Sequence, residues 1–287
     1  MDLPSLDVVV PAFDEQAVIA ECLDCLLAQG DDVGQIIVVD NGSTDLTAAI
    51  VTEYARQHPK VVLVSEPRPG VENARNTGFA ATRADIIGRI DADTRVARGW
   101  ARAARRYLGA HTELAGCCGA TTYYDLPWRA LTRFFTWLSV FFANQVIAGN
   151  YSFYGANMAI RQTSWQAIKD GIKTERDGEI MEDLSLSIAA ANIGQKIGRA
   201  ARMAADVSGR RFRTSPRDFA RYNARWWRTY WVYGQHAQAL LTRVFGCWVG
   251  DILMAAFSLT LRFHDPTTMR WSLENWRRGF GDRGFRG

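Results

Sequence analysis

The first 90 residues alternate between short apolar runs and stretches in which apolar positions recur every three or four residues. The second pattern is clear at Val18, Cys22 and Cys25, which would share one side of a helix. Each apolar run is long enough for one buried strand, and the runs occupy residues 6–10, 36–39, 61–64 and 85–90. Strands that alternate with helices predict an α/β fold, with a mainly parallel sheet and helices on both faces.

Charged side chains follow each predicted strand. They are Glu15 after the first strand, Asp40 and Arg68 after the second and third, and Asp91 and Asp93 after the fourth. In sheets of this kind, ligands bind at the carboxyl ends of the strands. We therefore expect these side chains to converge on one ligand site.

Asp91 and Asp93 flank a single alanine where the fourth predicted strand ends. If the chain is extended there, side chains two residues apart point to the same side. Neighbouring carboxylates repel each other unless a cation lies between them, and carboxylates suit Mg²⁺ or Mn²⁺. Asp-x-Asp pairs are also common in turns and solvated loops, so the position at a strand end is what favours a metal site.

The sequence signatures of several protein classes are missing from this chain. No Gly-x-Gly-x-x-Gly follows the first strand, and neither a phosphate-loop motif nor Gly-x-Ser-x-Gly occurs. These absences argue against dinucleotide-binding Rossmann domains, P-loop proteins and α/β hydrolases. The net charge of +4 is too small to indicate a nucleic-acid partner.

The cysteines and the start of the chain favour a cytoplasmic location. Cys22 and Cys25 would be neighbours on a helix, and no second cysteine pair or nearby histidine completes a zinc set, so buried reduced thiols are expected. The first residues have neither a basic segment nor an apolar run of the kind found in secretory signals.

Six segments resemble, in the same order, the signatures of family 2 glycosyltransferases. Together they extend over roughly residues 6 to 212. The segments are VVVPAFDE at 8–15, VVDNGSTD at 38–45, the glycines and ARN of 70–78, DAD at 91–93, GANMAIR at 155–161 and EDLSL at 182–186. The resemblance implies a GT-A fold with a mixed, mainly parallel sheet, a nucleotide-sugar donor and a Mn²⁺ or Mg²⁺ ion.

The resemblance also implies which residues bind the nucleoside of the donor. Asp40 matches the position that accepts a hydrogen bond from the nucleobase. Pro11 and Glu15 match positions that line the base and ribose. Arg68 would stack on the base or contact a phosphate. The donor is expected to be a UDP-sugar first and a GDP-sugar second.

Other matched positions concern the metal and the sugar. Asp93 would ligate the metal that bridges the diphosphate, and Asp91 would face the ribose or a metal-bound water. Gly155 and Asn157 would shape the sugar pocket, with the glycine allowing close approach of the backbone.

Glu182 and Asp183 open an apolar-periodic stretch, which places them at the start of a helix. Acids there can simply cap the helix and complement its dipole. One of them could instead take the proton from an acceptor hydroxyl. The resemblance favours Asp183 as the base of an inverting reaction without a covalent enzyme intermediate.

A basic stretch follows. Arg210 and Arg211 resemble a late loop that closes over the donor diphosphate, and arginine suits bidentate phosphate contact. The loop contains no histidine.

From Ser215 onward a helix is predicted, with its arginines on one face and its aromatic residues on another. This helix could pack with a solvated basic face, lie on a membrane surface, or, least in keeping with the rest of the chain, bind nucleic acid.

Two other stretches favour the membrane surface. Residues 128–147 are rich in Phe and Trp, and residues 244–261 are almost wholly apolar except for Asp251. An acid in the middle of a membrane span is costly, so a buried or amphipathic helix is favoured over a span. The basic tail adds Arg277, Arg278, Arg283 and Arg286. We expect peripheral contact with the inner leaflet of the plasma membrane and a lipid-linked or cell-envelope acceptor hydroxyl.

The predicted organisation is a glycosyltransferase domain at residues 1–212 and a helical, basic and aromatic extension at 213–287. Within the domain, residues 1–118 would bind the nucleotide sugar and 119–212 the acceptor. Two alternatives stay open. One is a non-catalytic scaffold of the same fold, which would be expected to have lost Asp93 or Asp183. The other is a sugar-1-phosphate nucleotidyltransferase, which should carry a glycine-rich loop after the first strand, where this chain has PAFDE.

Overall fold

The computed structural model describes residues 3–138, 143–173, 179–248, 251, 257, 260, 261, 263–266 and 268–272. The chain forms two compact units. Unit 1 comprises Met1–Thr121, Asn150–Thr174 and Glu182–Val207, and unit 2 comprises Thr122–Gly149, Glu175–Met181 and Ser208–Gly287. The domain boundary predicted at residue 212 stays a prediction.

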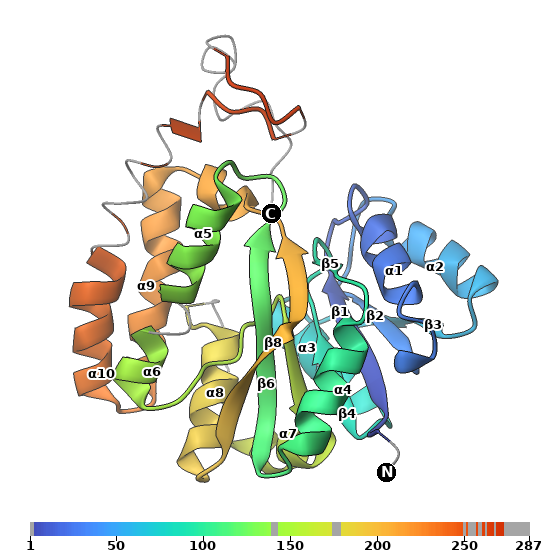
Figure 1. Cartoon of the computed structure of the whole chain (residues 1–287), viewed down its shortest axis with the longest axis horizontal. Coiled ribbons are helices and arrows are strands. Elements are labelled where there is room, and N and C mark those ends of the chain that lie inside the picture. The colour runs from blue at the N-terminus through green and yellow to red at the C-terminus, as the bar shows by residue number, and fades with distance from the viewer. Residues whose placement is uncertain are drawn as a thin grey trace. The chain divides into compact units, whose positions relative to one another are not determined.

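Unit 1 is built on a curved, mixed sheet (Figure 1). Among the described residues it has eight strands in the order β3-β2-β1-β4-β7-β6-β8-β5. Strands β3, β2, β1 and β4 are parallel, whereas β7 runs antiparallel to β4 and β6. The strands are β1 Leu6–Ala12, β2 Ile36–Asp40, β3 Val61–Ser65, β4 Ile86–Arg89, β5 Arg95–Val96, β6 Leu114–Tyr123, β7 Met158–Arg161 and β8 Lys196–Val207. The predicted α/β, mainly parallel fold class is confirmed.

Both faces of β1 are buried because helices cover the sheet on its two sides. Val8 and Val10 join the core with α1 and α4, while Val9 faces α3. At Gly78 of α3, a Cβ atom would collide with the Val9 side chain, so glycine lets this helix lie close to the sheet. The helices of unit 1 are α1 Ile19–Leu27, α2 Thr47–Gln57, α3 Val71–Ala81, α4 Trp100–Ala110, α7 Gln162–Ile168 and α8 Glu182–Asn192.

Unit 2 is mainly helical, as predicted for the C-terminal extension. Helix α9 begins as expected: the Ser215 side chain accepts a hydrogen bond from the Asp218 backbone N–H, and Pro216 is its first residue. Helix α9 packs against α10 and the π-helix η5, and α10 also contacts α6. The helices are α5 Arg129–Thr136, α6 Ala143–Ala148, α9 Pro216–Val232, α10 His236–Leu241 and η5 Thr242–Trp248.

The described part of the apolar stretch 244–261 packs on α9. The Asn223 side-chain amide of α9 donates to the Asp251 carboxylate over 2.9 Å, and the Cys247 thiol contacts the Asn223 carbonyl. The acid is therefore hydrogen-bonded within unit 2. In the part of the chain that the structure describes, no helix is both long and apolar enough to cross a membrane. The predicted basic tail, with Arg277, Arg278, Arg283 and Arg286, lies outside the described residues.

Candidate active site

The chain turns at Asp91 and does not continue as a strand. Strand β4 ends at Arg89, and the Thr94 N–H donates to the Asp91 carbonyl over 3.0 Å, which closes a tight turn over residues 91–94. The expectation of an extended chain at the Asp-x-Asp pair is therefore wrong. The Thr94 hydroxyl donates to the Ala156 carbonyl, so this turn is tied to the loop that precedes β7.

Side-chain hydrogen bonds connect the loops after β1 and β2. Asp14, which has a positive φ of 52°, accepts from the Thr44 N–H over 2.7 Å. The Glu15 N–H donates to the Thr47 hydroxyl over 2.8 Å, and Pro11 is a buried residue of β1. These bonds hold Glu15 beside the loop after β2, and Pro11 pairs with Val39 of β2 in the sheet; both were predicted to line the nucleoside.

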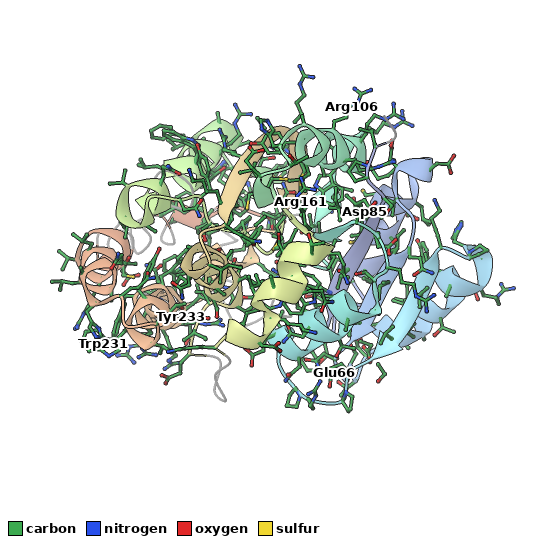
Figure 2. The ribbon with its side chains drawn as sticks, turned by 90° about the horizontal axis from the view of Figure 1, so that it is seen from below. Glu66, Asp85, Arg106, Arg161, Trp231 and Tyr233 are labelled. Carbon is green, nitrogen blue, oxygen red and sulfur yellow. The ribbon has the colours of Figure 1, made fainter. Side chains whose placement is uncertain are left out.

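Asp40 and Arg68 lie on neighbouring strand ends. Asp40 is 8% exposed, and its backbone carbonyl accepts from the Glu66 N–H. Arg68 forms a two-point ion pair with Glu66, over 2.9 Å from Nε and 2.8 Å from Nη2 (Glu66 is labelled in Figure 2). The Arg68 and Thr77 hydrogen bonds lower the pKa of Glu66 to about 2. The Asn41 side chain fixes the same loop through the carbonyls of Glu66 and Arg68.

Three predicted acids converge around Cys22 of α1. Burial raises the pKa of the Cys22 thiol well above its ordinary value, and the carboxylates of Asp93, Asp91 and Glu15 raise it further. These acids come from the loops after β1 and β4, and the expectation that they meet Asp40 and Arg68 at one ligand site stays a prediction. Cys22 and Cys25 are free thiols, and Cys22 is buried, in keeping with the predicted reduced pair.

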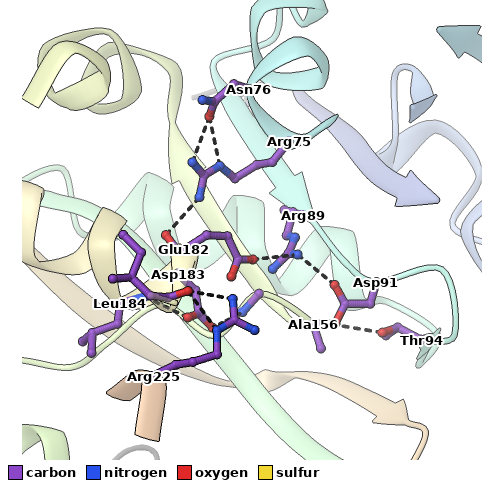
Figure 3. A network of polar contacts seen from close by, with 12 residues as sticks. Arg75, Asn76, Arg89, Asp91, Thr94, Ala156, Glu182, Asp183, Leu184 and Arg225 are labelled. Carbon is purple, nitrogen blue, oxygen red and sulfur yellow. Dashed lines mark hydrogen bonds and ion pairs between the residues drawn. The ribbon is translucent and has the colours of Figure 1, made fainter. Parts of the chain in front are cut away.

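Arg89 connects the Asp91 turn to the start of α8. This last residue of β4 is 3% exposed, and its Nη2 lies 2.9 Å from Asp91 Oδ1 and 2.9 Å from Glu182 Oε1. Figure 3 shows the guanidinium between the two carboxylates. A second buried arginine, Arg75 of α3, donates to the Glu182 backbone carbonyl over 2.9 Å.

Asp183 is a buried carboxylic acid with fixed orientation. One oxygen accepts from the Gly155 N–H over 3.1 Å and the other from the Leu184 N–H over 2.8 Å. Burial raises the pKa of Asp183 to about 7, and the adjacent Glu182 carboxylate adds to the rise. The two backbone hydrogen bonds and the Arg89 charge oppose this rise. An acid with a pKa near neutrality is suited to accept and release protons.

The two predicted sugar-pocket residues have structural partners. A Cβ atom at Gly155 would coincide with the Arg89 guanidinium, so glycine makes room for that buried group. Asn157 is fully buried: its Oδ1 accepts from the Trp100 indole N–H, and its Nδ2 donates to the carbonyls of Ala120 and Met203. Their predicted contact with the donor sugar stays a prediction.

The predicted phosphate loop belongs to unit 2, where Asp125 anchors it. The Asp125 carboxylate accepts from the Ser208 hydroxyl over 2.9 Å and from the Gly209 N–H over 2.6 Å. Arg210 follows in a short 3₁₀ turn, and the Arg211 guanidinium lies over the Tyr222 ring at 4.3 Å. Whether Arg210 and Arg211 contact a diphosphate stays a prediction.

The carboxylates of Asp91 and Asp93 have the chemistry that suits a hard divalent cation, and their ligation of a metal stays a prediction. Asp91 and Asp93 supply carboxylate oxygens, and among the described residues no group of three or more His, Cys, Asp or Glu could hold a metal. Mg²⁺ and Mn²⁺ are commonly bound by one or two carboxylates, with water and substrate phosphates completing the shell. Two acids at a strand end match that requirement.

Sequence reasoning missed Arg89, Asn41 and the function of Arg75. An arginine within an otherwise apolar buried strand, two residues before an acid, is a signal that could have identified Arg89. Its second partner, Glu182, is distant in sequence and could not have been assigned. Arg75, whose role the sequence leaves open, donates to the Glu182 carbonyl and to the Asn76 side chain.

The curved sheet, the strand-end acids and the buried Asp183 define a GT-A type α/β protein. Residues 7–165 match the family model described as glycosyl transferase family 2. More than half of the chain is covered, so it belongs to glycosyltransferase family 2.

Known relatives agree with this assignment. The probable glycosyltransferase YdaM of Bacillus subtilis is 29% identical over 212 residues, which is 68% of this chain and 49% of that protein. The uncharacterized glycosyltransferase EpsJ of the same organism is 33% identical over 91 residues, 32% of this chain and 26% of that protein. The chain thus spans between a quarter and a half of the length of these two relatives.

Solved structures share the fold. The mannosyltransferase PcManGT from Pyrobaculum calidifontis, in complex with GDP-Man and Mn²⁺, matches with a TM-score of 0.67 and 19% identity over 97% of this chain and 79% of that one. A fragment of S. aureus TarS in complex with UDP-GlcNAc matches with a TM-score of 0.57 and 17% identity. The match covers 90% of this chain and 72% of that one. At these identities the likeness concerns the fold alone.

Proposed function

We propose that this chain is an inverting, metal-dependent glycosyltransferase that moves a sugar from a nucleoside diphosphate sugar to an acceptor hydroxyl. The observation that carries the proposal is Asp183, a buried acid whose pKa is about 7 and which is held by two backbone amides. It lies beside Glu182, which shares Arg89 with Asp91. A candidate base and a candidate metal ligand are thereby linked within one network.

The donor nucleoside would bind along the ends of β1, β2 and β3. Asp40 would accept a hydrogen bond from the base, Pro11 and Glu15 would line the base and ribose, and Arg68 would stack on the base or bind phosphate. The loops after β1, β2 and β3 support this, because hydrogen bonds already fix their shape. A UDP-sugar is the favoured donor and a GDP-sugar the second, and the similar structures named here contain ligands of both kinds.

Asp91 and Asp93 would hold Mn²⁺ or Mg²⁺, which would stabilise the charge of the leaving diphosphate. Arg210 and Arg211 are proposed to contact a diphosphate through their guanidinium groups. Gly155 and Asn157 would border the sugar. The solved complex of the mannosyltransferase with Mn²⁺ supports a metal of this kind.

Asp183 would take the proton from the acceptor hydroxyl as its oxygen attacks the anomeric carbon. The new carbon–oxygen bond forms on the face opposite the diphosphate, and the bond from the anomeric carbon to the diphosphate oxygen breaks. The nucleoside diphosphate leaves with the bonding electrons, and the configuration at the anomeric carbon inverts. The proton stays on Asp183 until it is released to solvent.

The acceptor is proposed to be lipid-linked or part of the cell envelope, with unit 2 lying on the inner leaflet. Of fifteen exposed large apolar side chains among the described residues, eleven belong to unit 2. Trp231, at the surface of α9 (Figure 2), is 55% exposed, and Phe134 of α5 is 52% exposed. Residues 126–150 and 219–250 contain no Asp or Glu, whereas both contain arginine. Apolar side chains in stretches that carry arginine and no acid suit an anionic lipid surface.

The activity is tested with a panel of UDP- and GDP-sugars, Mn²⁺ and a set of acceptors with free hydroxyl groups, which includes polyprenyl-linked sugars. The proposal predicts metal-dependent release of one nucleoside diphosphate and a product whose anomeric configuration, read by NMR, is opposite to that of the donor. A product with retained configuration would contradict the inverting mechanism. Release of a sugar 1-phosphate and a nucleoside triphosphate in pyrophosphate would instead identify a nucleotidyltransferase.

A further inference from the structure

A single nitrogen of Arg89 joins the two ends of the candidate site. Its Nη2 lies 2.9 Å from a carboxylate oxygen of Asp91 and equally far from one of Glu182. The Arg89 side chain is 4% exposed, against 41% for Asp91 and 12% for Glu182. Its Nε has no hydrogen-bond partner within the described residues. The guanidinium is therefore a buried cation bound directly to these two carboxylates, and the Asp183 carboxylate also stabilises its charge.

The surrounding backbone leaves this guanidinium little room to move. Arg89 is paired within the sheet with Val9 on one side and Met158 on the other. Gly155 packs directly on the guanidinium, where any Cβ atom would overlap it. A close-packed interior confines the group to its position between the two acids.

The two acids share the same nitrogen. Hydrogen bonds between charged groups are stronger than those with a neutral partner. If Glu182 loses its charge, Arg89 binds Asp91 more firmly, and Asp91 is then less free to ligate a cation. If Asp91 turns toward a cation, Arg89 is free to bind Glu182 more firmly and to steady the start of α8, where Asp183 lies.

We propose that Arg89 is a positioning residue that couples the metal ligand Asp91 to Glu182, so that the charge on Glu182 controls how readily Asp91 binds the metal. This inference rests on the proposed function, because it takes Asp91 as a metal ligand. Glu182 itself would not touch the metal, and Arg89 carries its effect.

A double-mutant cycle on Mn²⁺ affinity tests the coupling. Mn²⁺ binding is measured by calorimetry at a saturating concentration of UDP, or of GDP, on the full chain. We expect Glu182→Gln to weaken Mn²⁺ binding about fivefold in the wild-type background. In an Arg89→Gln background the same change should alter the dissociation constant by less than about twofold, because the connecting group is gone.

Two further variants make the cycle interpretable. If Arg89→Gln does not fold, Arg89→Lys replaces it. The lysine ammonium lacks the planar fork of the guanidinium, so Glu182→Gln should then weaken Mn²⁺ binding only about twofold or less. Arg102→Gln is the matched control: this arginine pairs with Asp32 at the surface, and its loss should leave the fivefold effect intact.

The possible results separate the inference from the proposed function. An equal effect of Glu182→Gln with and without Arg89 would be a through-space electrostatic effect and would overturn the coupling, while the proposed function would stand. A wild-type protein that binds Mn²⁺ with neither nucleotide would overturn the metal-dependent function and the coupling with it.

Discussion

At the scale of the residue, the site depends on Asp183, a carboxylate that the fold keeps away from water. Two backbone N–H groups hold it, and the side chain is 5% exposed. Burial alone would make the charged form costly, and the Glu182 carboxylate next to it makes that form costlier still. Arg89 offsets part of this cost. The outcome is an acid that changes its charge near neutral pH.

Asp183→Asn tests the assignment of the base. The amide keeps the size of the side chain but cannot take a proton, so kcat should fall by at least about 10²-fold. The dissociation constant of the donor with Mn²⁺ should stay within about threefold, because Asp183 acts on the acceptor. Both are measured by nucleoside diphosphate release and calorimetry. Asp170→Asn, at an exposed position, serves as the control, and full activity of Asp183→Asn would refute the assignment.

The pH dependence follows from the raised pKa of Asp183. The base must be ionised to act, so kcat/KM should rise with pH through about 7 and level off above it. Glu182→Gln removes the adjacent negative charge and should move this rise to lower pH.

The same pKa sets the sign of the effect on stability. Between about pH 4, where an ordinary Asp ionises, and about pH 7, the folded state holds a proton that the unfolded state has lost. This group should therefore make the protein less stable as pH rises through that window, and Asp183→Asn should weaken this dependence. A rise in kcat/KM centred near pH 4 would show that the pKa of Asp183 is not raised. It would contradict both the expected pH dependence of activity and the expected pH dependence of stability.

At the scale of the element, strand ends and turns place the site. The four parallel strands β1 to β4 were predicted to within two residues at either end, because each is a buried apolar run such as 36–39. The turn at Asp91 was not predicted, since Asp-Ala-Asp-Thr fits a strand end as well as a turn. The bridge from Arg89 to Glu182 could not be predicted, because it depends on how β4 and α8 pack.

Asn157 is an element-scale cross-link that holds β6, β7 and β8 to α4. Its side chain satisfies the Trp100 indole N–H and the carbonyls of Ala120 and Met203, all within unit 1. Asn157→Ala leaves these buried groups unpaired, so the free energy of unfolding should fall by about 2–4 kcal/mol.

Urea denaturation measures this change as a lower midpoint with an unchanged slope. Asn73→Ala is the matched control, because the Asn73 side chain makes a solvent-accessible bond to the Pro69 carbonyl. The control should lose less than about 1 kcal/mol. Equal losses in the two variants would show that Asn157 is not a cross-link.

At the scale of the whole molecule, the two units differ in surface character. Unit 1 carries the candidate site residues apart from Arg210 and Arg211, whereas unit 2 carries most of the exposed large apolar side chains among the described residues and two long stretches without acids. On α5, Leu131 and Phe134 are 47% and 52% exposed, beside the exposed Arg129 and Arg133. A surface of this composition is costly in water alone, and the proposed contact with anionic lipid would account for it.

Co-sedimentation with vesicles tests the membrane surface. We expect the protein to sediment with phosphatidylglycerol vesicles and much less with phosphatidylcholine ones, and we expect salt to weaken the binding. Phe134→Glu should weaken it at least about fivefold, since it removes apolar contact and adds a repelled charge. Leu46→Glu, at a side chain of unit 1 that is 64% exposed, is the control. Equal vesicle binding by the wild type, Phe134→Glu and Leu46→Glu would contradict the proposed membrane surface.

The central claim is that the strand-end acids form a metal-dependent nucleotide site, and a thermal-shift panel tests it most directly. UDP, GDP, TDP and their common sugars are each added with and without Mn²⁺ to the wild type, to Asp93→Ala and to the exposed control Asp31→Ala. A ligand at about 100 times its dissociation constant adds about 2.7 kcal/mol of stability, which corresponds to a shift of several degrees. The account predicts that one nucleotide stabilises the wild type and Asp31→Ala only with Mn²⁺, and does not stabilise Asp93→Ala. Stabilisation by no nucleotide, or equal stabilisation of Asp93→Ala, would contradict it.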